Sequence, residues 1–344
     1  MEILTDIYKP TSLEEVGAGG AILARLGSEV PHVVIHGPEG SGKLTLAHLW
    51  LAKVFGESVH RLRCEPWECK TASKTVELTV YRSSNHFVIN PSQHSGGLDR
   101  CILQTFIREV AATSNVSRYG VDGGKLAFKV VVVQNADQLT EAAQNALRNT
   151  LETYVASCRI VLLARSLSKL TAAITSRCLR VRSSGDPARV LQLAKRVVGD
   201  KSIMVDASQV EALAAAAGSS YRRVLSDLQL VMAGLAPQDE TSRVLGQIAK
   251  CAATGDISRL QDIRSCLYGL LANGQRPTAI LRGVLMHTLR LPGLSRAQQV
   301  NAVAEAAVAN STLSRGGKVI LHLEFFCAAL LREWGSSEGV RTQK

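Results

Sequence analysis

One stretch of sequence decides the fold of this chain, Val33-Val-Ile-His-Gly-Pro-Glu-Gly-Ser-Gly-Lys-Leu-Thr45. A short β-branched run enters a glycine-rich loop that ends on Lys43, and residues 44–55 continue with the apolar spacing of a helix. Strand, glycine loop and helix in this order are the setting of a phosphate-binding P-loop. Main-chain N–H groups converge on phosphate oxygens in such a loop, and the following helix adds its positive end. The stretch therefore predicts a nucleotide-binding α/β fold.

The residues predicted to hold the nucleotide are those of the loop and of the first helical positions. They are Gly37, Pro38, Gly40, Ser41, Gly42, Lys43, Leu44 and Thr45. A P-loop normally has Ser or Thr directly after its lysine, where the hydroxyl holds Mg²⁺. This chain has Leu44 there, and Thr45 lies about 100° further round the helix. We therefore expect ATP or ADP to bind, with Mg²⁺ bound weakly or not at all.

A second motif also lacks its usual acidic residues. The buried strand predicted over Lys129–Val133 runs into Gln134 and Asn135, where a P-loop ATPase places a metal-binding Asp and a water-activating Glu. An amide gives a metal ion no charge compensation, and Asn135 cannot accept a proton from attacking water. Three residues separate Asp137 from the end of the strand, which we expect to place it too far from the phosphates. The sequence predicts nucleotide binding without hydrolysis.

Composition narrows the class of protein. The chain has 344 residues, 46% of them apolar and 20% charged, which predicts two or three folded domains. Aromatic residues make up only 4%, which argues against a stacking surface for single-stranded bases. The net charge of +11 fits either a solvated basic surface or a phosphate-rich partner. No run reaches the ~20 apolar residues that span a bilayer, so we expect an intracellular, soluble protein without membrane contact.

Local patterns divide the chain into three predicted domains. Buried strands and helices alternate over residues 1–167, as in a doubly wound sheet. Residues 168–238 read as a small lid domain, whose helical unit follows a turn cluster, Ser183–Pro187. Residues 239–344 read as an all-α domain, with a final helix predicted over Lys318–Trp334. Cys64 and Cys69 are the one close cysteine pair, and we predict no metal site because no second pair completes a zinc site.

The tripeptide Ser176-Arg-Cys178 leaves two interpretations open. Arg177 is either an ordinary surface residue or an arginine that reaches the nucleotide site of a neighbouring subunit and stabilises transition-state charge. The tripeptide alone does not choose between them.

Taken together, these motifs resemble a small subunit of replication factor C, the eukaryotic sliding-clamp loader of the AAA+ family. The third-subunit type of the human complex is the most similar class, because it too has a non-hydroxyl residue after the P-loop lysine and a degenerate acidic motif. The segments that carry the resemblance are Ile7–Pro10, Leu13–Val16, Pro31–Pro38, Asn90–Ser92, Asp99–Arg100, Ala143–Arg148, Ser176–Cys178 and Ser314–Glu324.

The resemblance implies roles for individual residues. Arg177 would be an arginine finger acting in trans, and Arg222 the lid arginine that senses the nucleotide's phosphates. Arg165 stands where the family usually has a sensing Asn. Gln104 lies in the helix from which other small subunits extend an Arg to DNA phosphate, so direct DNA contact by this subunit is not expected.

The resemblance also implies partners and a location. The all-α domain would be the collar of a nuclear heteropentamer, and the partners would be the other loader subunits, the sliding clamp and, mainly through the complex, primer-template DNA. Whether this subunit is itself an enzyme stays open.

Other functions fit parts of the sequence. One is the non-hydrolysing subunit of the bacterial clamp loader, although the four-cysteine zinc module usual there is absent from this sequence. A second is a free-standing P-loop ATPase that uses Thr45 and Asp137 as displaced ligands. A third is a basic nucleic-acid-binding module with no clamp partner, which would show steeply salt-dependent affinity for DNA.

Overall fold

The structure, a computed structural model, describes residues 3–27, 30–70, 75–93, 98–113, 118–119, 125–126, 128–201, 205–234, 240–292, 294–315 and 318–338. Contacts divide the chain into two compact units, Met1–Ala236 and Pro237–Lys344. The predicted domain boundary between residues 238 and 239 lies outside the described residues. The division into three domains therefore stays a prediction.

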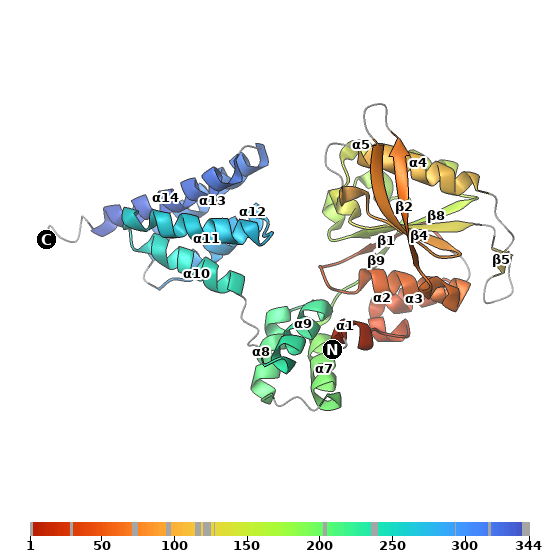
Figure 1. Cartoon of the computed structure of the whole chain (residues 1–344), viewed down its shortest axis with the longest axis horizontal. Coiled ribbons are helices and arrows are strands. Elements are labelled where there is room, and N and C mark those ends of the chain that lie inside the picture. The colour runs from red at the N-terminus through yellow and green to blue at the C-terminus, as the bar shows by residue number, and fades with distance from the viewer. Residues whose placement is uncertain are drawn as a thin grey trace. The chain divides into compact units, whose positions relative to one another are not determined.

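A mixed, mostly parallel sheet forms the centre of the first unit (Figure 1). Its strand order is β2-β3-β4-β7-β8-β1-β9, in which the last five run parallel and β2 and β3 pair antiparallel at one edge. In that order the strands span Arg63–Lys70, Thr75–Arg82, His86–Ile89, Lys129–Val133, Cys158–Ala164, Val33–His36 and Leu179–Arg182. A separate short pair joins β5 (Arg118–Tyr119) to β6 (Lys125–Leu126).

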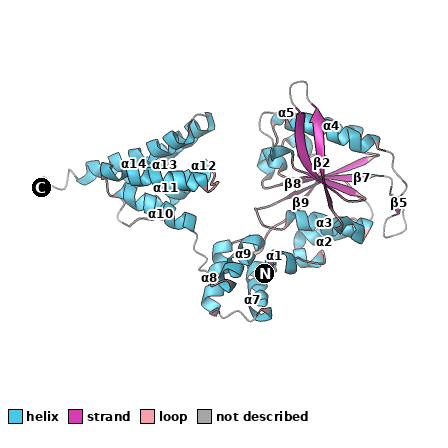
Figure 2. Ribbon diagram, in the orientation of Figure 1, coloured by secondary structure: helices cyan, strands magenta, loops and turns pink. Residues whose placement is uncertain are grey.

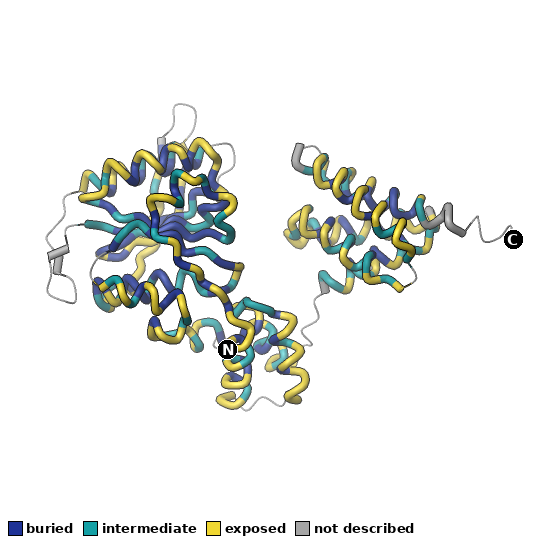
Figure 3. The backbone as a smooth tube through the Cα atoms, turned by 180° about the vertical axis from the view of Figure 1, so that it is seen from behind, coloured by how far each residue is buried: buried dark blue, intermediate teal, exposed yellow. Residues whose placement is uncertain are grey.

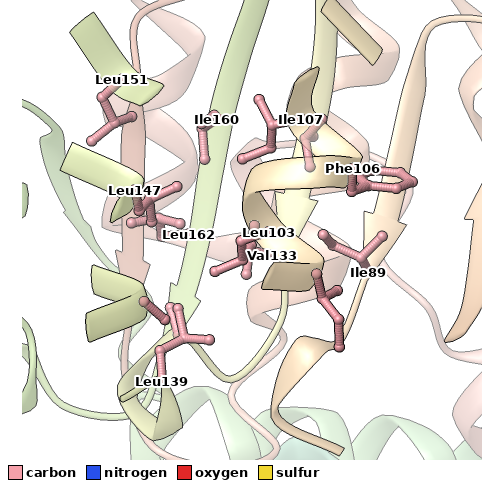
Figure 4. Packing of buried hydrophobic residues seen from close by; sticks show 14 of the residues in the cluster. Ile89, Leu103, Phe106, Ile107, Val133, Leu139, Leu147, Leu151, Ile160 and Leu162 are labelled. Atoms are coloured by element: carbon pink, nitrogen blue, oxygen red, sulfur yellow. The ribbon is translucent and has the colours of Figure 1, made fainter. Parts of the chain in front are cut away.

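Helices cover both faces of this sheet because its central strands are apolar on both sides. In β7, Val131 and Val133 pack with α4 and α5, as the close view in Figure 4 shows for Val133. Val130 and Val132 point to the other face and pack with α2 and α3. These helices span Ala18–Ala24 (α2), Lys43–Phe55 (α3), Asp99–Ala112 (α4) and Glu141–Thr153 (α5). The predicted doubly wound P-loop fold is confirmed, and Figure 3 shows the buried residues gathered in the sheet.

Three further helices of the first unit form a small bundle with its own core. They are α7 (Pro187–Asp200), α8 (Ala207–Ala217) and α9 (Tyr221–Met232). Asp186 begins the bundle by accepting a hydrogen bond from the Ala188 N–H, the usual way to satisfy a helix's first donors. Leu4, from α1 (Leu4–Ile7), is 1% exposed and packs into this core. The N-terminal segment is thereby anchored to the lid.

In its described residues the second unit is built of helices (Figure 2). They pack around one apolar core. They are α10 (Glu240–Ala253), α11 (Leu260–Ala272), α12 (Pro277–Leu289), α13 (Arg296–Arg315) and α14 (Val319–Glu338). The sequence pattern predicted an end of the last helix at Trp334, and the structure continues it to Glu338. No proline interrupts these polar residues, so their composition does not stop a helix. No helix in the described part of the chain is long and apolar enough to cross a membrane.

The sequence does not predict the edge hairpin of β2 and β3, although β3 has the pattern of a strand. In β3, Val76, Leu78 and Val80 alternate with exposed residues, the period-two pattern of a half-buried strand. Its partner β2 contains Pro66 and several charged residues, which strands normally exclude. An edge position tolerates both because one side of the strand needs no partner.

Burial keeps several histidines of the first unit neutral. The Ile160 N–H donates to Nδ1 of His32 at 3.0 Å, and Nε2 of His32 donates to the Leu151 carbonyl oxygen at 3.1 Å. Burial lowers the pKa of His32 to about 4. It also lowers the pKa of His48 to about 4 and that of His86 to about 3. None of these imidazoles readily accepts a proton in the folded chain.

We therefore expect the first unit to lose stability as the pH falls below the ordinary histidine pKa of about 6.5. Above it, both the folded and unfolded states hold neutral imidazoles, so these groups contribute nothing. Below it, the unfolded chain binds protons that the folded chain cannot, and the free energy of unfolding falls by up to about 1.4 kcal/mol per pH unit for each histidine.

The urea midpoint of unfolding at about pH 5 should accordingly lie below that at about pH 7.5. His32→Gln should reduce the difference, because it removes one of the titrating groups. Equal midpoints at the two pH values would contradict the expectation.

Candidate nucleotide-binding site

The predicted phosphate loop connects β1 to α3 and is shaped by its glycines. The Gly37 N–H donates to the Ala164 carbonyl oxygen of β8 at 3.1 Å, which ties the loop to the neighbouring strand. Gly40 and Gly42 have φ angles of +76° and +82°, a left-handed conformation that side chains disfavour. Gly42 directly precedes α3, so the first main-chain N–H groups of this helix face the loop. This is the geometry of an anion-binding loop.

The Lys43 ammonium lies inside the curve of the loop. Nζ donates to the Gly37 carbonyl oxygen at 2.9 Å and to that of Pro38 at 2.7 Å. Burial lowers the pKa of Lys43, and the carboxylates of Glu39 and Asp137 oppose the shift. Lys43 is thus placed where a phosphate group would lie, surrounded by the loop's own carbonyl groups.

The lid helices lie directly against the loop. Ser183, after β9, donates its hydroxyl to the Ser41 carbonyl oxygen at 2.9 Å. A Cβ added at Gly40 would lie 2.0 Å from the Ser220 Oγ at the start of α9, so only glycine fits there. The Arg222 N–H points to the Gly40 carbonyl oxygen at 3.5 Å. The structure therefore brings Arg222 beside the phosphate loop.

The positions that hold Mg²⁺ in a P-loop ATPase do not fit a metal ion. Leu44 is half-buried and packs against the apolar core beneath α3. Gln134 donates its main-chain N–H to the Ile89 carbonyl oxygen, and its side chain is a neutral amide. Asn135 has a left-handed backbone (φ 52°), and its Nδ2 donates to Asn90 Oδ1 at 3.4 Å. Leu44 offers no ligand atom, and the two amides offer only neutral oxygens, which give Mg²⁺ no charge compensation.

An ion pair that the sequence did not reveal lies at the edge of the loop. The Arg165 main-chain N–H donates to Asp137 Oδ1 at 3.1 Å, and its side-chain Nε donates to Oδ2 at 3.3 Å. Nη1 of Arg165 lies 3.7 Å from Glu39 Oε2 in the loop. Asp137 is 6% exposed, so its carboxylate is committed to this arginine. The pair argues against Asp137 as a displaced ligand of a free-standing ATPase.

Arg177 lies on the surface, just after α6 (Ala172–Thr175). Its side chain is 39% exposed, and it forms an ion pair with Glu152 of α5. Nη1 also donates to the Ala173 carbonyl oxygen at 2.9 Å. Gln144 holds the preceding turn: its Nε2 donates to the Lys169 carbonyl oxygen at 3.0 Å, and its Oε1 accepts the Thr171 N–H at 2.9 Å. A half-exposed guanidinium is thus fixed at the edge of the domain.

The remaining candidate residues are less constrained. Thr45 and Gln104 are both half-buried, in α3 and α4. The structure gives neither of them a functional contact, so their roles stay predictions. Among the described residues, no cluster of His, Cys, Asp or Glu could hold a metal ion.

Family models match parts of both units of the chain. Residues 27–185 match the family model described as DNA polymerase III, delta subunit, and residues 243–337 match that of the replication factor C subunit 3 C-terminal domain. Replication factor C subunit 3 of Arabidopsis thaliana is 30% identical, over 95% of this chain and 96% of its own length. The chain belongs to the replication factor C small-subunit family.

Other replication factor C proteins match over a similar extent. Human replication factor C subunit 3 is 29% identical over 96% of each chain, and subunit 5 of Saccharomyces cerevisiae is 28% identical over 96% of this chain and 99% of its own. Among solved structures, a variant of RuvB from Thermotoga maritima aligns with 96% of this chain and 92% of its own at 14% identity, with a TM-score of 0.46. The sequence relatives span both units and support the replication factor C assignment over the bacterial one.

Proposed function

We propose that this chain is a non-hydrolysing small subunit of a nuclear, pentameric clamp loader that opens a sliding clamp and loads it onto primer-template DNA. It would bind ATP or ADP as a structural ligand and supply Arg177 in trans to a neighbouring subunit. The observation that carries the proposal is a well-formed phosphate loop around Lys43 beside positions 44, 134 and 135, which offer neither a metal ligand nor a base.

The loss of hydrolysis follows from the chemistry of those positions. Asn135 cannot accept the proton of an attacking water, and its side chain donates to Asn90 instead. Leu44 and Gln134 remove the charge compensation that a metal ion would supply. Losing a base and a metal ligand together lowers turnover by several orders of magnitude, whereas binding rests on the loop and Lys43, which are intact.

The second unit supports assembly. Several large apolar side chains on α13 and α14 are exposed. Monomeric soluble proteins rarely expose large apolar patches, because such patches favour association. They are Val300, Val303, Val308, Leu321 and Phe325, with exposed fractions between 47% and 60%. We infer that neighbouring loader subunits cover this surface in a collar.

Nucleotide binding without turnover tests the proposal directly. We expect the purified full-length chain to bind a fluorescent ATP analogue and to release no phosphate above background. Lys43→Ala should weaken binding on the order of 10- to 100-fold, since a charge-assisted contact to phosphate is lost. Lys53→Ala is the matched control, because Lys53 lies in the same helix and its Nζ donates to the distant Ala24 carbonyl oxygen.

Magnesium-dependent phosphate release by the isolated chain would contradict the proposal. The chain would then be a free-standing ATPase that hydrolyses ATP with amides at positions 134 and 135. Steeply salt-dependent DNA binding by the isolated chain would instead favour a basic nucleic-acid-binding module.

A further inference from the structure

Arg165 places a permanent positive charge between the sheet edge and the phosphate loop. It directly follows β8, and Asp137 follows β7, the neighbouring parallel strand. Parallel neighbours end at the same edge of a sheet, so the two residues meet although they are 28 positions apart. With Nε and the main-chain N–H held by Asp137, the far end of the guanidinium is directed to the loop, where Nη1 lies 3.7 Å from Glu39 Oε2.

The same edge of the sheet is where a P-loop ATPase holds its metal ion. In this chain Leu44 packs into the core and Gln134 is an amide. Asp137 has the carboxylate nearest to these positions along the chain, and Arg165 already neutralises it. A divalent cation would therefore meet no unpaired carboxylate among these residues and would be repelled by two cations, Lys43 and Arg165.

We propose that Arg165 replaces Mg²⁺ in this site, so that the chain binds a nucleoside di- or triphosphate in its metal-free form. Lys43 and the start of α3 would contact the phosphates from the loop side, and Arg165 from the strand side. A guanidinium is always charged, and its planar fork of donors suits phosphate oxygens. Arg222 lies beside Gly40 and adds a further cation at the lid.

The inference rests on the proposed function, because it specifies the form in which this site takes its nucleotide. It concerns Arg165, where the resemblance described under Sequence analysis implies a neutral asparagine as the usual residue of the family. An arginine is tolerated at this position because the Asp137 carboxylate, 3.3 Å from Arg165 Nε, balances its charge.

Equilibrium binding of fluorescent ADP to the full-length chain, measured in magnesium and in EDTA, tests the proposal. We expect equal or tighter binding in EDTA, because the metal-free nucleotide is the ligand. Arg165→Ala should weaken binding in EDTA on the order of 10- to 100-fold. Arg108→Ala is the matched control, since Arg108 is exposed on α4, and its affinity should equal that of the unchanged chain.

A second variant separates a lost contact from a damaged fold, because Arg165→Ala leaves the buried Asp137 carboxylate without its arginine. Arg165→Gln combined with Asp137→Asn replaces the ion pair with two amides. We expect this double variant to unfold at nearly the temperature of the unchanged chain and still to lose binding in EDTA. Normal binding in EDTA by a well-folded double variant would overturn the role of Arg165.

The outcomes distinguish the two proposals. Binding that requires magnesium and disappears in EDTA would overturn the role assigned to Arg165 and leave a nucleotide-binding subunit in place. An unchanged chain that binds nucleotide under neither condition would overturn the structural-nucleotide role, and the inference with it.

Discussion

Replacing Arg177 with alanine is expected to abolish most ATP turnover at the one neighbouring site that this residue would reach. An arginine supplied in trans stabilises the charge of the transferring phosphoryl group and contributes on the order of 10³-fold or more to turnover. The ATP turnover of the whole complex should fall by the fraction that this site contributes, because the other sites keep their own arginines. The measurement is steady-state phosphate release by the reconstituted complex with clamp and primer-template DNA.

The geometry makes this a test of chemistry rather than of folding. Among the described residues, the Arg177 side chain donates hydrogen bonds to Glu152, to the Ala173 carbonyl oxygen and to the Ser176 hydroxyl, all at exposed positions. Its loss should thus leave no buried group unpaired. The complex should therefore still assemble, as size-exclusion chromatography would show. Arg180→Ala, an exposed arginine of β9, is the matched control and should retain full turnover. Unchanged turnover with Arg177→Ala would exclude the trans-acting role.

Placing charges on the exposed face of α14 is expected to prevent assembly. Leu321 and Phe325 are 56% and 59% exposed and lie one helical turn apart, so they form one apolar surface. Leu321→Asp with Phe325→Asp would place two carboxylates in an interface, and burying an unpaired charge costs several kcal/mol. We expect the double variant to lose co-purification with the other loader subunits by at least about 100-fold.

Two controls accompany this experiment. The isolated double variant should retain its helical circular dichroism and its unfolding temperature, because both side chains already face solvent. Ile22→Asp, a charge at an exposed apolar position of α2 in the first unit, should leave assembly unchanged. A double variant that enters the complex normally would show that α14 is not part of the collar interface.

Much of the fold was predictable because its signals are local. The strand, loop and helix around Lys43 are contiguous, and so are the apolar runs that became β7 and β8. Thr140 begins α5 by accepting the Ala143 N–H, a local interaction that threonine commonly makes at the start of a helix. The hairpin of β2 and β3 was not predictable, because the residues of β2, Arg63–Lys70, do not alternate between apolar and polar. A strand of that composition forms only when a neighbour supplies its partner.

The sequence by itself determined the residue types at the positions from which a phosphate loop without a metal ligand or a base is predicted, because that prediction depends on residue types at fixed spacing. Only the tertiary structure decided which distant residues surround that loop. Arg165 meets Asp137 because two parallel strands end at one edge of the sheet, and Ser220 meets Gly40 because the lid folds back onto the loop. Such contacts depend on strand order and helix packing, which residues adjacent in sequence do not encode.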